Sequence, residues 1–171
     1  MLNYIKLTEV GPVPDVKRGL TILNQAKRAG YMAMGKYWFI TIRPQHFSNR
    51  ATSKYGYDPR SGDPGKPGEY GFQKSYQGRK LAEHGHTRPL EQTGASRAAT
   101  GTGTLTSSSR HVRISMPAGW IGSSAHRRHG IDLADELTRV DQADTEILGE
   151  IFIAVARKAY LAGVSQAVEV M

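Results

Sequence analysis

Residues 141–163 read DQADTEILGEIFIAVARKAYLAG, and this stretch has the clearest helical pattern in the chain. Its apolar residues recur every three or four positions, which predicts a helix with one buried face. Asp141 is a good N-cap, Arg157 and Lys158 suit the helix end, and Gly163 is a natural C-terminal stop. The stretch therefore predicts a closing helix, with an apolar stripe of Ile147, Leu148, Ile151, Phe152, Val155 and Ala159.

A second helical pattern begins at Asp15 and ends at Pro44, because the residue before a proline disfavours the helical conformation. Gly19, Gly30 and Gly35 each weaken a helix by roughly 1 kcal/mol relative to alanine, so packing must stabilise this one. Residues 37–42 also fit a strand. The apolar positions are Val16, Leu20, Leu23, Ala26, Ala29, Ala33, Tyr37 and Ile40, and the largest expected buried contribution is Tyr37, Trp38 and Phe39.

Between these helices the pattern changes to that of a hairpin. Residues 110–116 alternate apolar and polar, residues 99–106 place threonines on one face, and Ser107 to Ser109 supply the turn. Residues 131–140 fit either a helix or a strand, and the strand is slightly preferred.

Residues 48–71 contain no large aliphatic side chain and are rich in Gly and Pro at their centre. Such a segment cannot form a core of its own, and long unstructured loops are usually functional or disordered. We therefore predict an extended arm over residues 48–76, anchored by its aromatic side chains. The whole chain, residues 1–171, then forms a single α+β domain in which two helices pack on a small antiparallel sheet.

The charge is unevenly distributed along the chain. Residues 1–131 hold 20 basic and 7 acidic residues, a net charge of +13, whereas residues 132–171 hold 3 and 8, a net charge of −5. A basic surface attracts nucleic-acid phosphates, and a basic body can also meet the acidic end of a second copy. Both interpretations stay open, together with that of a solvated surface without a partner.

The sequence offers little for catalysis, cofactor binding or metal binding. Without cysteine there is no disulfide framework, thiolate zinc site or cysteine nucleophile. The histidines at 84, 86, 126 and 129 lie in basic stretches, where cations repel a metal. No phosphate-binding loop follows Gly101. We therefore expect no enzyme, no cofactor and no metal, and neither a signal peptide nor a membrane span.

Two segments resemble the minor tail, tail-completion and virion-morphogenesis proteins of tailed bacteriophages, which include head–tail connectors. The first is Tyr37-Trp38 and Ile42-Arg43-Pro44-Gln45-His46-Phe47-Ser48, running into Tyr55-Gly56-Tyr57-Asp58-Pro59-Arg60. The second is His86-Thr87-Arg88-Pro89-Leu90-Glu91-Gln92-Thr93-Gly94 followed by Arg97, which is similar to the family's Pro-Leu…Thr-Gly segment that leads into a hairpin. Ala95 departs from the large apolar residue expected after Thr-Gly.

The resemblance implies assembly rather than catalysis. Copies would form a ring at the head–tail neck or at the tail end, with other neck and tail proteins as partners and genomic DNA in the lumen. The protein would be made in the host cytoplasm and reside in the virion. Its candidate interface or arm residues are Tyr55, Tyr57, Arg60, Tyr70, Phe72 and Arg88.

The remaining candidate residues are charged. The alternative to a virion subunit is a basic protein that binds nucleic acid without reading its sequence. Candidate DNA-facing or subunit-facing residues are Arg79, Lys80, Arg97, Arg110, Arg113, Arg127 and Arg128, and the candidate acidic partner face is Asp132, Asp135 and Glu136.

Overall fold

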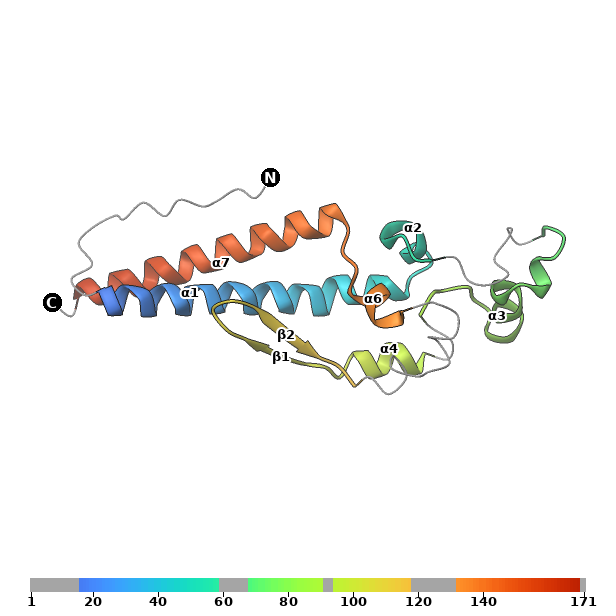
Figure 1. Cartoon of the computed structure of the whole chain (residues 1–171), viewed down its shortest axis with the longest axis horizontal. Coiled ribbons are helices and arrows are strands. Elements are labelled where there is room, and N and C mark those ends of the chain that lie inside the picture. The colour runs from blue at the N-terminus through green and yellow to red at the C-terminus, as the bar shows by residue number, and fades with distance from the viewer. Residues whose placement is uncertain (1–15, 59–67, 91–93, 118–131, 170–171) are drawn as a thin grey trace.

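The computed structural model describes residues 16–58, 68–90, 94–117 and 132–169, and within them the chain forms helices and one two-stranded antiparallel sheet (Figure 1). The fold is therefore mixed α+β. The elements in chain order are α1 (Val16–Tyr37), the π-helix η1 (Trp38–Ile42), the 3-10 helix η2 (Arg43–Phe47), α2 (Ala51–Tyr55), the 3-10 helix η3 (Phe72–Lys74), α3 (Tyr76–His84), α4 (Ala95–Thr100), β1 (Thr104–Ser107), β2 (Val112–Ser115), α6 (Leu133–Thr138) and α7 (Gln142–Glu169).

The two long helices, α1 and α7, lie side by side and antiparallel (Figure 1). Gly30 of α1 has no room for a side chain, because a Cβ there would lie 2.8 Å from Cδ2 of Phe152 and 2.9 Å from its carbonyl oxygen. Further along, a Cβ on Gly163 would lie 2.7 Å from Cγ2 of Ile22. Gly163 is thus a contact residue inside α7, and the prediction that it ends the helix is wrong.

The β1–β2 hairpin packs on the other side of α1 from α7 (Figure 1). Leu105 and Ile114 are paired in the sheet, and the inner positions of both strands are half-buried while the outer ones are exposed. A Cβ on Gly35 would lie 2.5 Å from Cγ2 of Val112, so the absence of a side chain at Gly35 lets the hairpin approach α1 closely. The hairpin prediction is confirmed with shorter strands, since residues 95–100 form α4. The sheet packs on α1 rather than on both long helices.

Pro44 does not end the helical backbone that starts in α1. The chain widens into η1, where the Arg43 N–H donates to the carbonyl oxygen of Trp38, and then tightens into η2 with Pro44 at its start. This change of register meets the constraint that proline, which lacks an N–H, cannot continue the ordinary helical hydrogen bonds. The alternative of a strand over residues 37–42 is wrong. Trp38 is buried as expected, whereas Tyr37 and Phe39 are half-buried.

Residues 133–138 form a helix, α6, so the preference for a strand there is also wrong. The Asp132 side chain caps it by accepting hydrogen bonds from the N–H groups of Ala134, at 2.9 Å, and Asp135, at 3.1 Å. Burial of Leu133 and Leu137 on one face completes the helical arrangement. An N-cap aspartate followed by acidic residues in the first turn outweighs the weak alternation of apolar residues.

The first part of the predicted arm belongs to the core. Ala51, Tyr55 and Tyr57 are buried, and they pack with Ile42 of η1 and Phe47 of η2. Gly56 has a φ of 59°, in the left-handed region that favours glycine, and it ends the one-turn helix α2. The prediction of an extended arm is therefore wrong for residues 51–57, and residues 59–67 lie outside the described residues.

The apolar positions of the first turns of α1 differ from the prediction. Val16 and Leu20 are exposed, and the residues buried in the helix are Ala26, Gly30 and Gly35. Among the described residues, no helix combines the length and apolarity needed to cross a membrane.

Replacing Gly30 by alanine should lower the free energy of unfolding by about 1–3 kcal/mol, because the added Cβ displaces Phe152 and its backbone. The matched control is Gly149→Ala in α7, where a Cβ meets no atom within 4 Å. That variant should be more stable by about 0.5–1 kcal/mol through helix propensity. Urea unfolding measures both. Stabilisation by Gly30→Ala would contradict the close approach of α1 and α7.

Candidate functional site

The candidate basic residues lie in two regions rather than on one surface. Arg110 and Arg113 are exposed on the hairpin, in the turn and on the outer face of β2, and Arg97 is exposed on α4. Arg79 is exposed on α3, at the far end of the molecule from the start of α1 (Figure 1). Lys80 is buried and donates to the carbonyl oxygen of Arg88. Arg127 and Arg128 lie outside the described residues.

Arg43 of η2 fixes α4 to η1. Its Nε donates to the carbonyl oxygen of Phe39 at 3.0 Å, and its Nη1 donates to the Thr100 Oγ1 at 3.0 Å and to the carbonyl oxygen of Arg97 at 3.2 Å. Burial and the nearby positive charge of Arg97 lower the pKa of Arg43. This contact positions the Arg97 backbone and leaves its side chain exposed.

The candidate interface residues divide into buried and exposed groups. Tyr55, Tyr57 and Phe72 are buried in this chain, whereas Tyr70 is fully exposed. Arg88 is half-buried, and Arg60 lies outside the described residues. Of the described residues in this group, Tyr70 is thus the one most available to a neighbouring copy.

The acidic residues at 132, 135 and 136 serve contacts within the chain. Asp132 caps α6, and the Asp135 Oδ2 pairs with the Arg139 Nη2 at 2.8 Å. Glu136 is fully buried, and its Oε1 accepts from the N–H of Asp58 at 3.3 Å. The prediction of an acidic partner face at these positions is wrong for Glu136, and Asp135 already has a cationic partner.

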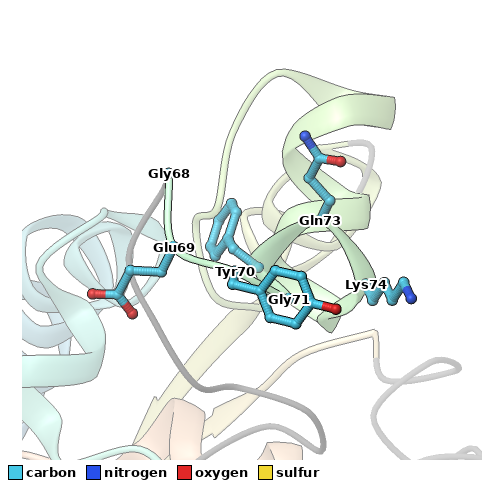
Figure 2. Close-up of a pocket in the computed structure, with 7 residues that line it drawn as sticks. Gly68, Glu69, Tyr70, Gly71, Gln73 and Lys74 are labelled. Atoms are coloured by element: carbon cyan, nitrogen blue, oxygen red, sulfur yellow. The ribbon is translucent and has the colours of Figure 1, made fainter.

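A shallow pocket of about 330 Å³ is lined by residues 68–74, around η3. Figure 2 shows that Glu69, Gln73 and Lys74 point in different directions, and that Tyr70 extends outward. Ligand sites usually have a few polar groups that converge on one point. The labelled side chains do not converge, so this pocket has little to hold a small molecule.

Sequence reasoning missed a buried polar cluster at the junction of η2, α2 and α7, formed by His46, Lys54, Tyr55, Tyr57 and Asp144. The His46 ring stacks on Tyr55 with centroids 3.9 Å apart, and its Nδ1 hydrogen-bonds to the Tyr57 hydroxyl. A signal was present, because Ala51 and Tyr55 have helical spacing and a glycine follows them.

Lys54 connects this cluster to the start of α7. Its Nζ donates to the Asp144 Oδ1 at 2.8 Å and to the Gln45 Oε1 at 2.7 Å, and it lies 3.6 Å from the Asp141 Oδ2. Asp141 in turn accepts the Asp144 N–H at 2.7 Å, which confirms it as the helix cap. Burial is the largest single influence on Lys54 and would lower its pKa, but the interactions with Asp144 and Tyr55 together outweigh it, so the pKa is raised.

Burial controls the protonation of the two stacked rings. It lowers the pKa of His46 to about 4, although the charge of Asp144 opposes the change. It also raises the pKa of Tyr55 to about 12. Both groups are therefore neutral near pH 7, as suits a structural cluster inside the fold.

The histidines of the described residues do not form a metal site. The rings of His84 and His86 stack with centroids 6.3 Å apart, but no group of three or more His, Cys, Asp or Glu side chains among the described residues could hold a metal ion.

No family model, curated protein or solved structure matches this chain.

The His46 cluster predicts a pH dependence of stability. The folded protein binds the His46 proton less readily than the unfolded chain, so stability should fall as the pH drops from about 6.5 to about 4. The loss from this group would be about 3 kcal/mol. His46→Asn, which keeps a polar atom near Tyr57, should flatten this part of the profile. Urea unfolding at several pH values tests it, and equal slopes in both proteins would contradict the assignment.

Proposed function

We propose that this protein is a structural subunit of a tailed-phage particle that assembles with its own copies into a ring at the head–tail neck or the tail end. The supporting observation is that apolar side chains are exposed at both ends of the elongated molecule. Val16 and Leu20, at the start of α1, are 76% and 55% exposed, and Tyr70 beside η3 is fully exposed at the other end (Figure 1). Contacts between unlike surfaces join copies head to tail, and such contacts can close into a ring.

The order of elements around α4 also supports the proposal, because it agrees with the resemblance to tail-completion proteins. Gly94 has a φ of 83° directly before α4, and α4 leads into β1. The resemblance gives the same order, in which a Pro-Leu…Thr-Gly segment runs into a hairpin.

The opposite charges of the two long helices suit contacts between copies. The charged residues of α1 are all basic, and Lys17, Arg18, Arg28 and Lys36 are exposed. Exposed acidic residues occur in the first half of α7, including Glu150. Opposite charges on different surfaces guide association and fix its geometry. In this role the partners are further copies, other neck and tail proteins, and genomic DNA in the ring lumen.

A second candidate function is nucleic-acid binding without sequence recognition. It is favoured by three exposed arginines in one stretch of the chain: Arg97 on α4, Arg110 in the hairpin turn and Arg113 on β2. Exposed arginines can contact phosphates without reading base sequence. Binding of this kind weakens steeply with salt, whereas a ring closed by apolar contacts does not.

Tyr70→Ser should abolish or strongly reduce ring formation without lowering the melting temperature, because the Tyr70 side chain is exposed in the single chain. Gln73→Ser, at an exposed neighbour that lines the same pocket, is the matched control and should form rings normally. Electron microscopy of the purified proteins counts the closed rings. Absence of rings from the unaltered protein, or normal rings from Tyr70→Ser, would count against this assembly.

A further inference from the structure

Helix α7 presents an uncovered apolar face on the side opposite to α1. The buried side meets α1 through Phe152 and Gly163. On the outer side, Ile147, Ile153 and Leu161 are 38%, 45% and 54% exposed. A helix that is apolar on both sides normally has a partner on each of them.

The residues along the middle of this outer face have a regular order. Ile147, Glu150, Ala154, Arg157 and Leu161 are spaced by three, four, three and four positions, which is the spacing of a coiled-coil seam. All five are exposed. On the N-terminal side of Ala154 the acidic Glu150 comes first and the apolar Ile147 follows. On the C-terminal side the basic Arg157 comes first and the apolar Leu161 follows.

This order is complementary to itself when it is reversed. In an antiparallel pair of α7 helices centred on Ala154, Ile147 of each copy meets Leu161 of the other, and Glu150 meets Arg157. In a parallel pair, Glu150 would face Glu150 and Arg157 would face Arg157, and like charges oppose association. Among the described residues, no ion pair already engages Glu150 or Arg157.

We propose that the outer face of α7 binds the same face of a second copy, antiparallel and about a two-fold axis at Ala154. The small side chain at the axis allows the helix axes to approach to the usual distance of about 8–10 Å. A two-fold contact uses the same surface on both copies, unlike the head-to-tail contacts of a ring. It therefore involves α7 alone and does not depend on the proposed virion role. If rings form as well, the contact would join two of them back to back.

The absence of native cysteines makes the axis directly testable by oxidation. In Ala154→Cys the two thiols would face each other across the axis and should form a disulfide-linked dimer at low protein concentration. Ala143→Cys is the matched control on the same helix. In the antiparallel pair its two thiols would be about 33 Å apart, at 1.5 Å per residue, and should not cross-link. Equal cross-linking of both variants, or of neither, would overturn the proposal.

Charge reversals in the Ala154→Cys chain test the pairing itself. Glu150→Arg alone and Arg157→Glu alone should each slow cross-linking at least tenfold, because each brings like charges together twice. An equimolar mixture of the two should cross-link as heterodimers at nearly the original rate, since every pair is then opposite in sign. Arg28→Glu, an exposed reversal on α1, should change nothing, and circular dichroism verifies that each variant folds. Unchanged rates in the single reversals, or a mixture that fails to recover, would overturn the antiparallel pairing.

Discussion

The close approach of other elements to α1 at its glycines is the constraint on which the rest of the structure depends. Phe152 of α7 occupies the space beside Gly30, and Val112 of the hairpin occupies the space beside Gly35. These glycines cost helix propensity, but they let two different elements pack on opposite sides of one helix. Because α1 is covered in this way, the inner side of α7 is fixed and its outer side faces away from the molecule.

A second set of contacts holds the short helices that follow α1 to the start of α7. Lys54 reaches from α2 to Asp144, and the His46 ring of η2 stacks against Tyr55. The short helices that follow α1 thereby form a compact core beside the long helical pair. The molecule is elongated as a result, with different exposed apolar residues at its two ends, and this shape is the basis for the proposed assembly.

The sequence predicts the elements that have a repeating apolar pattern over many residues. It does not predict the features that depend on single tertiary contacts. The stripe through Phe152 and the cap at Asp141 identified α7, and alternation around Ile114 identified the hairpin. Gly163 misled because a glycine suits both a helix end and a close helix contact, and only Ile22 distinguishes them. The lack of large aliphatic side chains over residues 48–71 favours an arm, but Tyr55 and Tyr57 are buried by aromatic stacking with His46, which leaves no periodic signal in the sequence. For the candidate site, exposure of Tyr70, Arg110 and Arg113 could not follow from composition, since it depends on packing.

The central claim is that this chain associates with itself through exposed apolar surfaces and is not primarily a nucleic-acid-binding monomer. The most direct measurement is the mass of the purified protein by light scattering, with and without duplex DNA, at low and high salt. We expect a discrete multiple of the 18.8 kDa chain that persists at high salt and does not require DNA. A single-chain mass that increases only with DNA, and only at low salt, would contradict the claim and favour phosphate binding.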